Sequence, residues 1–295
     1  MRKIASIILI MIISFMCIGT VPAEAKSTLE LDKTEMTLVV GKSYTLKVCG
    51  TTKKAANKTF KWSSSKPSVA TVNKNGKVKA KKAGTTVITA KKGNRKLKCK
   101  VTVQTKWKKL LDTYRNDDAV QQLLFVEYKG NAKADVLLYQ KEGTKWERIL
   151  KCTGYVGKNG IDKKKQGDKK TPTGVYNLTS GFGIKSNPGT TMPYVEVNKY
   201  QYWCADKKYY NQLVDVREVP HKCTGEHLID YVPHYNYGMF LDFNKDCKYK
   251  KGAAIFLHCT GSTKYTSGCI AVSQKNMIKI LQNVQEGAKI CIYKK

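Results

Sequence analysis

Residues 254–273, AIFLHCTGSTKYTSGCIAVS, place a buried-strand pattern before a polar loop and a glycine–cysteine turn. The apolar run ends in His258, and Cys269 follows Gly268 directly. Glycine lets the backbone of such a turn approach a ligand closely, and N–H groups on the turn can hold an oxyanion. An imidazole that folds back onto a thiol helps to form the thiolate. These residue types point to a cysteine nucleophile with a histidine base, and the alternative is a core histidine beside a structural cysteine.

Strand patterns surround this stretch over the C-terminal half. Apolar runs are found at residues 123–126, 136–139 and 146–150, and further runs continue to the end of the chain. Short apolar runs separated by turn signals predict β-strands. One helix is predicted between Gln274 and Val284, opened by Ser273 as its N-cap. A short amphipathic helix is predicted within residues 105–122.

The N-terminal half alternates polar and apolar residues with a period of two. Turn signals at Gly41, at residues 73–76 and at Gly84 separate its apolar runs. Short alternating runs with frequent turns predict an all-β sandwich over residues 27–104. A linker is expected at residues 105–121 and a second domain at 122–295. The chain is therefore predicted to be mainly β, with one or two short helices.

A motif in the first domain supports the sandwich. The run WSSSKPSVATV at residues 62–72 is followed by NGKV at 75–78 and AGT at 83–85. In this order the segments resemble the group-two bacterial immunoglobulin-like domain, which implies a spacer or adhesion module of surface proteins and not a catalyst. Cys49 and Cys99 either bridge inside this domain or stay free. The apolar phase of the strands leaves both possibilities open, because Cys99 is in phase and Cys49 is one residue out of phase.

The opening stretch resembles the signature of the L,D-transpeptidase catalytic domain (YkuD-type). In that family a strand-borne histidine is followed by a Ser/Thr-x-Gly-Cys turn, matched here by His258 and by residues 266–269. Familiar members carry a second histidine before the glycine, where this chain has Ser267. The residues after the cysteine, Ile270-Ala271-Val272, fit a subgroup whose motif ends in Gly-Cys-(Ile/Val)-Ala-(Leu/Val).

Other segments resemble the same family in the same order. They are VGKNG at 156–160, GDKKTPTGVY at 167–176, WCAD at 203–206, Tyr210-Asn211, DFN at 242–244 and GAAIFLH at 252–258. The resemblance therefore covers roughly residues 122–295 and implies the L,D-transpeptidase type of β fold.

The resemblance implies roles for the residues of the motif. Cys269 would attack the carbonyl of an L,D-peptide bond in a peptidoglycan stem and form a thioester. His258 would take the thiol proton and return one to the leaving amine. A backbone carbonyl, of Cys259 or Thr260, would orient its second ring nitrogen. The N–H groups of Gly268 and Cys269 would form the oxyanion hole.

The implied activity is that of an acyltransferase that crosslinks or remodels the cell wall. An amine of a neighbouring stem would resolve the thioester, and water in its place would give carboxypeptidase activity. The residues expected to bind the substrate are Ser267, Thr266, Cys259, Trp203 and Tyr210. The resemblance implies no metal and no other cofactor.

The charge balance and the first residues indicate where the protein works. The formal net charge is +32, from 54 Lys and Arg against 22 Asp and Glu, and such a field concentrates polyanions. Residues 1–25 combine a basic start, an apolar run and Ala23-Glu24-Ala25, which are the parts of a secretory signal peptide. We therefore expect an exported wall protein whose partners are stem peptides and anionic wall polymers, not nucleic acid. The membrane is expected as a partner only through an uncleaved leader.

Rival interpretations of the second domain belong to other classes. A non-catalytic surface protein, wall-binding or adhesin-like, would fit the same fold and the missing histidine at position 267. A sortase-type transpeptidase would need an arginine near the nucleophile, and Arg217 lies in no such motif.

One polar segment carries two further possibilities. The spacing of His221, Cys223, His227 and His234 could suit a zinc ion, although the segment lines up with a family stretch that needs no metal. Cys204 and Cys223 could instead form a disulfide.

Overall fold

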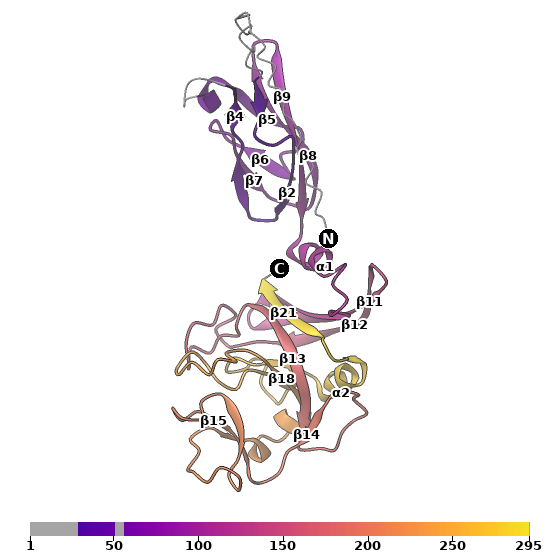
Figure 1. The fold of residues 1–295 in the computed structure, drawn as a ribbon, viewed down its shortest axis with the longest axis vertical. Helices are drawn as coiled ribbons and strands as arrows, with labels where there is room; N and C mark the ends of the chain where they lie inside the picture. The colour runs from indigo at the N-terminus through magenta and orange to yellow at the C-terminus, as the bar shows by residue number, and fades with distance from the viewer. Residues whose placement is uncertain (1–28, 51–55, 295) are drawn as a thin grey trace, which may run out of the picture. The chain divides into compact units, whose positions relative to one another are not determined.

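The computed structural model describes residues 29–50 and 56–294. The chain divides into two compact units, Met1–Gln104 and Thr105–Lys295, and each unit has its own strands and core (Figure 1). The predicted leader, residues 1–25, lies outside the described residues. Within the described ranges, no helix is both long and apolar enough to cross a membrane.

The first unit is built from short strands in three sheets. The largest has the order β2-β9-β8-β5, a second has β3-β7-β6, and β1 pairs with β4. The elements are β1 (Glu30–Leu31), β2 (Glu35–Val39), β3 (Ser43–Thr45), β4 (Val48–Cys49), the 3-10 turn η1 (Ala56–Thr59), β5 (Lys61–Ser64), β6 (Ala70–Val72), β7 (Lys77–Ala80), β8 (Gly84–Lys92) and β9 (Arg95–Gln104). Along β7 and β8, buried residues alternate with more exposed ones, so the predicted sandwich is confirmed.

Residues of the immunoglobulin-like motif at 62–78 stabilise the packing of this unit. Trp62 Nε1 donates a 2.9 Å hydrogen bond to the carbonyl of Asn57. Gly76 has φ +77, and a Cβ there would lie 2.6 Å from a backbone oxygen, so the turn requires glycine. Cys99 is buried in the core and Cys49 is exposed, and both are free thiols. The possible bridge between them is therefore not formed.

The second unit is organised around one nine-stranded sheet with the order β14-β13-β18-β19-β20-β12-β11-β10-β21. Its elements are α1 (Lys106–Thr113), β10 (Gln122–Gly130), β11 (Lys133–Glu142), β12 (Lys145–Tyr155), β13 (Gly174–Gly183), β14 (Tyr194–Glu196), β15 (Gln201–Cys204), β16 (Gln212–Asp215), β17 (Glu226–His227), η2 (Leu228–Asp230), η3 (His234–Asn236), β18 (Gly238–Leu241), β19 (Phe256–Cys259), β20 (Ile270–Val272), α2 (Gln274–Asn283) and β21 (Lys289–Lys294).

The sheet closes on itself. β13 pairs with β18 on one side and also with β21, the yellow strand in Figure 1. Leu124, Val136, Leu257 and Ile270 are all fully buried in the same aliphatic core, and burial of each such side chain contributes on the order of 1.5–3 kcal/mol. The strands that carry the histidine and cysteine motif are therefore central and rigid.

Both predicted helices are present. Ser273 caps α2 by accepting a hydrogen bond from Asn276 N, and Met277, Ile280 and Leu281 form its buried face. The spacing of these three residues is that of one helical stripe. Helix α1 lies inside the expected linker, and its apolar residues pack against a cluster around Phe125. The contacts assign it to the second unit.

A small three-stranded sheet, β16-β15-β17, is separate from the large one. Glu226 on β17 pairs with Trp203 on β15. A Cβ on Gly225 would lie 1.9 Å from the Trp203 carbonyl oxygen, so glycine permits this close approach. A disulfide between Cys204 and Cys223 joins the same two segments.

Candidate active site

Strand pairing brings Cys269 and His258 to one face of the sheet. β19 and β20 run parallel, and their register places His258 opposite Ala271. Cys269 precedes Ala271 by two residues, so the two side chains point to the same face. Cys269 and His258 both line a cavity of about 210 Å³. The structure thus brings together the two residues that the motif singled out.

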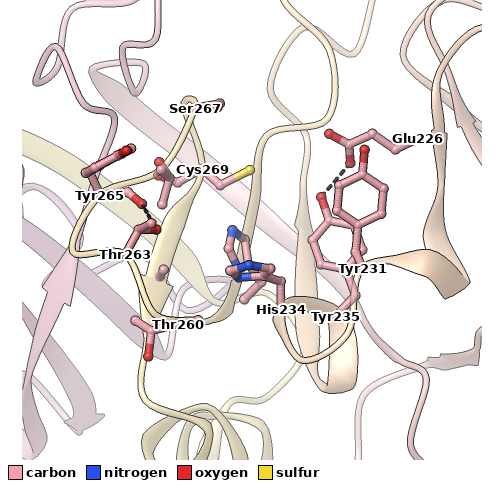
Figure 2. A pocket seen from close by; sticks show the side chains of 13 residues that line it. Glu226, Tyr231, His234, Tyr235, Thr260, Thr263, Tyr265, Ser267 and Cys269 are labelled. Atoms are coloured by element: carbon pink, nitrogen blue, oxygen red, sulfur yellow. Dashed lines mark hydrogen bonds between the residues drawn. The ribbon is translucent and has the colours of Figure 1, made fainter.

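The cavity is lined by residues from two regions of the second unit. Cys269 and Ser267 lie on one side, Glu226 and Tyr231 lie on the other, and His234 lies between them (Figure 2). The complete lining is Glu226, Tyr231, His234, Tyr235, His258, Thr260, Gly261, Thr263, Tyr265, Thr266, Ser267, Cys269 and Ala271.

The thiol of Cys269 is held in its neutral form. Its Sγ donates to the carbonyl of Ala254 at 3.1 Å and accepts from Phe256 N at 3.4 Å. Burial and, next, the Glu226 carboxylate raise the pKa of the thiol to about 12, while the Phe256 N–H and Lys163 act in the opposite direction. Among the described residues, no hydrogen bond joins Sγ to His258. The resting site is therefore not a thiolate–imidazolium pair.

The imidazole of His258 is also neutral and has a fixed orientation. Its Nδ1 is 2.8 Å from the carbonyl oxygen of Cys259, one of the two expected partners. A carbonyl only accepts, so Nδ1 carries the proton and Nε2 is left as the basic nitrogen. Burial lowers the pKa of His258 to about 4. At neutral pH the imidazole is therefore in its unprotonated form, which is the form that can act as a base.

Two threonine hydroxyls fix the backbone of Cys269. Thr266 Oγ1 donates to the Cys269 carbonyl at 2.7 Å, and Thr171 Oγ1 donates to the same oxygen at 3.0 Å. The Gly268 N–H donates to Thr266 Oγ1 at 3.1 Å. In this state the Gly268 N–H, expected in the oxyanion hole, is already engaged by Thr266.

The predicted substrate-binding residues divide into two groups. Ser267 is exposed and lines the cavity, and Thr266 lines it with its hydroxyl engaged. Cys259 is buried in the core, with its thiol toward the carbonyl of Tyr237. Strand alternation explains this placement, because His258 and its neighbour in sequence must face opposite sides.

Trp203 and Tyr210 lie outside the cavity lining. Trp203 packs on Phe256 in a separate core cluster, with ring centroids 4.8 Å apart. Tyr210 is buried, donates to Gln166 Oε1 at 3.0 Å and accepts from Gly252 N. The structure places both aromatic residues in supporting positions and not in contact with the cavity.

The sequence did not predict that Glu226 and His234 line the cavity with Cys269. Glu226 is partly buried and accepts a hydrogen bond from the Tyr235 hydroxyl. His234 approaches the carbonyl of Cys259 with Nδ1 at 3.3 Å. These residues come from β17 and η3, far from the motif in sequence. Strand and turn patterns around them carry no signal that this segment folds over the cysteine.

The four residues whose spacing could suit a zinc ion do not come together. His234 lines the cavity, and His227 bonds Asp230 and the carbonyl of Lys199 at 2.8 Å each. His221 and Cys223 lie elsewhere, beside Cys204, which forms the disulfide with Cys223. Tertiary placement and not sequence spacing decides which of these side chains meet.

Comparison with known proteins identifies both units. Residues 27–103 match the bacterial Ig-like domain (group 2), and residues 121–292 match the L,D-transpeptidase catalytic domain. A comparison with curated proteins found no match.

Several solved structures are similar to the chain. The helical cell shape determining protein Pgp2 from Campylobacter jejuni is 16% identical over 64% of this chain and 55% of its own, with a TM-score of 0.36. An L,D-transpeptidase from Mycobacterium smegmatis is 12% identical over 90% of this chain and 99% of its own, with a TM-score of 0.29. Domains 4 and 5 of the S-layer protein SbsC are 27% identical over 26% and 50%, with a TM-score of 0.21.

The chain spans about half the length of the Pgp2 and SbsC structures. The catalytic-domain match covers more than half of this chain. The chain therefore belongs to the L,D-transpeptidase catalytic domain family, and a group-2 bacterial Ig-like domain precedes its catalytic domain.

Proposed function

We propose that this protein is an exported L,D-transpeptidase that acts on peptidoglycan stem peptides, with Cys269 as nucleophile and His258 as base. The observation that carries the proposal is the placement of both side chains on one face of the β19–β20 pair, lining one cavity. The hydrogen bond from His258 Nδ1 to the Cys259 carbonyl supports it further, because it leaves Nε2 basic.

Acylation begins from a neutral thiol and a neutral imidazole. When the donor stem enters, the Cys269 proton leaves the Ala254 carbonyl and passes to His258 Nε2. Sγ then forms a bond to the stem carbonyl, and the leaving amine takes the proton from the imidazolium as the peptide bond breaks. The thioester that results stores the acyl group until an amine arrives.

Backbone N–H groups at Gly268 and Cys269 are the proposed oxyanion donors. Gly268 N donates to Thr266 Oγ1 in the resting state, so the Thr266 hydroxyl must yield when the oxyanion forms. Thr266 and Thr171 both donate to the Cys269 carbonyl and fix its position. Loss of one oxyanion donor typically lowers the rate by about 10²–10³.

Glu226 gives the cavity a preference for cations. None of the residues that line it is Lys or Arg, and Glu226 is its carboxylate, in a chain of net charge +32. We assign Glu226 to the ammonium group of a diamino-acid side chain, that of the acceptor stem. Binding a cation there would place the amine beside the thioester and favour transfer over hydrolysis. Burial raises the pKa of Glu226, and the hydrogen bond from Tyr235 acts in the opposite direction.

The surroundings of the catalytic domain fit the cell wall. Stem peptides and anionic wall polymers carry negative charges, which a chain of net charge +32 attracts. The Ig-like domain would act as a spacer outside the catalytic unit. Residues 1–25 have the sequence features of an export signal.

The test is intact-mass spectrometry of residues 26–295 after incubation with a carbapenem, whose lactam mimics the acyl donor. We expect one covalent adduct on the reduced wild-type protein and none on the Cys269→Ala variant. If the folded, reduced protein forms no adduct, the enzyme proposal fails and a wall-binding protein takes its place.

A further inference from the structure

We propose that Cys204, Asp206, His221 and Cys223 form a zinc site when the disulfide between the two cysteines is reduced. The four residues come as two short pairs, Cys204-x-Asp206 and His221-x-Cys223. One ligand atom from each lies within 4.8 Å of all the others. Two cysteines, a histidine and a carboxylate are a donor set that suits tetrahedral zinc.

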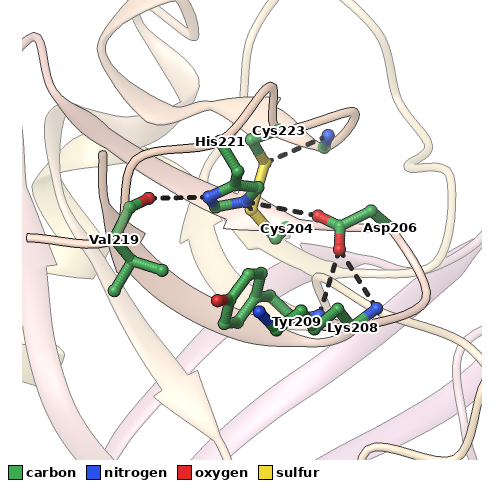
Figure 3. Close-up of a disulfide and its surroundings, with 8 residues drawn as sticks. Cys204, Asp206, Lys208, Tyr209, Val219, His221 and Cys223 are labelled. Atoms are coloured by element: carbon green, nitrogen blue, oxygen red, sulfur yellow. Dashed lines mark hydrogen bonds and ion pairs between the residues drawn. A yellow bond between two sulfur atoms is a disulfide. The ribbon is translucent and has the colours of Figure 1, made fainter. Parts of the chain in front are cut away.

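The orientation of His221 is that of a metal ligand (Figure 3). Its Nδ1 is 2.7 Å from the carbonyl of Val219, so Nδ1 carries the proton. Its Nε2 therefore presents a lone pair, 3.2 Å from Cys204 Sγ and 3.4 Å from Asp206 Oδ2. A histidine that binds a metal is typically held in this way, by a backbone carbonyl on its other nitrogen.

Asp206 offers one oxygen to the same point. Its Oδ1 accepts hydrogen bonds from the N–H groups of Lys208 and Tyr209, both at 3.1 Å. Its Oδ2 is buried and accepts no hydrogen bond from the described residues; it faces His221 Nε2 at 3.4 Å, which carries no proton when Nδ1 does. A buried oxygen without a partner is costly, and a cation between Oδ2 and His221 Nε2 would remove that cost.

A backbone N–H group lies where it would stabilise a thiolate at Cys223. The N–H of Gly225 points to its Sγ at 3.4 Å, and such a bond stabilises a thiolate. Gly225 is also the residue that allows β17 to approach β15. The second coordination shell of the proposed site is thus built into the local backbone.

Reduction of the Cys204–Cys223 disulfide supplies the two thiols that would bind zinc. A dithiol reductant exchanges with the Cys204–Cys223 disulfide, so two S–H groups form and the reductant becomes a cyclic disulfide. Zn²⁺ then replaces the two thiol protons, which are released to solvent. The same sulfurs serve both states, so disulfide and zinc exclude each other. Either linkage joins β15 to the segment that enters β17 and carries Glu226.

The test measures zinc bound by residues 26–295 in a Cys269→Ser background, which removes the cavity thiol as a competing ligand. The protein is reduced with a phosphine, mixed with zinc chloride, desalted and analysed for metal. We expect one zinc ion per reduced chain and none on the disulfide form. Cobalt in place of zinc should give the thiolate charge-transfer bands of a tetrahedral site.

Variants separate this site from adventitious binding. His221→Ala and Asp206→Asn should lose or weaken the zinc, whereas His227→Ala and Cys247→Ser, which change a histidine and a thiol outside the cluster, should retain it. Circular dichroism verifies that each variant is folded. Zinc content in the folded His221→Ala variant equal to that of the parent, or no zinc on the folded, reduced parent, would overturn the proposal.

Discussion

The hydroxyl of Thr171 donates a 3.0 Å hydrogen bond to the carbonyl oxygen of Cys269. Thr171 is fully buried and also accepts a hydrogen bond from Gly157 N at 2.9 Å. It opens the TPTG run at residues 171–174, which resembles a family motif. The motif therefore holds the backbone of the nucleophile from a distance of 98 residues in sequence.

Thr171→Val tests this connection. The substitution keeps the shape but leaves the Gly157 N–H without its acceptor, which costs about 1–3 kcal/mol in unfolding free energy. It also frees the Cys269 carbonyl on one side, so carbapenem acylation should slow. Thr173→Val is the matched control, because the Thr173 hydroxyl bonds exposed Asp162. Urea unfolding and acylation rates should change together at 171 and little at 173, and equal effects at both positions would contradict the role given to Thr171.

Gly268→Ala should disable the turn before the nucleophile. Gly268 has φ +150, and a Cβ there would lie 3.0 Å from Ile255 Cδ1 and 3.1 Å from the Lys170 carbonyl oxygen. The turn must shift to admit it, so the rate of Cys269 acylation should fall by at least about tenfold. Gly143→Ala is the control, because Gly143 also has positive φ but open space around it. An unchanged acylation rate in the folded Gly268→Ala protein would contradict this view of the turn.

The pH dependence of acylation should reflect the buried pair. Because the pKa of His258 is lowered to about 4, the basic imidazole persists on acidification until the pH approaches that value. The carbapenem acylation rate should therefore have its acid limb near pH 4. An acid limb near the ordinary histidine pKa of about 6.5 would show that His258 is not shielded as described.

The raised pKa of Cys269 should appear in the alkaline pH dependence of its alkylation. Its thiol pKa is raised to about 12, so reaction with iodoacetamide in the absence of donor should keep rising with pH through the alkaline range. Peptide mapping reads this site apart from the other thiols. A plateau near neutral pH would instead indicate a preformed thiolate.

Glu226→Gln separates binding of the amine from formation of the thioester. Glutamine can still accept the Tyr235 hydrogen bond but lacks the charge, and a charge-assisted hydrogen bond contributes about 1.5–3 kcal/mol. We expect the KM for a diamino-acid acceptor to rise roughly tenfold or more and hydrolysis to gain over transfer. Carbapenem acylation should not slow, because loss of the carboxylate removes one of the causes that raise the pKa of Cys269. Asp230→Asn, an exposed acid on the neighbouring η2, is the control.

The outcomes distinguish the possible sources of the ammonium group. A slower acylation by a stem-peptide donor with an unchanged acceptor KM would assign Glu226 to the donor. No change in either step would remove Glu226 from the proposed mechanism, while the carbapenem adduct would still support Cys269 as the nucleophile.

The parts predicted from sequence are those whose signals are local. The mainly β fold, helix α2 with its Ser273 cap, and the placement of His258 and Cys269 at one cavity are consistent with strand periodicity and one motif. Cys259 is among the residues expected from the sequence to bind substrate. The alternation of β19 turns its side chain into the core, and the same rule applied to the sequence would have excluded it.

Glu226 and His234 could not be predicted in this way. They reach the cavity because β17 pairs with β15 and η3 packs beside β19, which depends on tertiary contacts across the unit. The residues whose spacing could suit zinc lie apart for a related reason, since His221 contacts Cys204 and Asp206 rather than the later histidines.

The parallel pairing of β19 and β20 gives the chain room to vary. Leu257 pairs with Ile270, so the return from the end of β19 to the start of β20 spans only about 8 Å, from two residues along a strand and one strand spacing. About three extended residues would span that distance, but a parallel pair needs a longer connection because the chain must turn back to its starting edge. The connection from Thr260 to Cys269 is much longer, and most of its residues line the cavity. Thr260 and Thr266 are tied to the sheet by backbone hydrogen bonds to Val272 and Val156, whereas residues 262–265 between them are exposed. New acceptor preferences can therefore evolve at residues 262–265 by insertion or substitution while the sheet stays intact.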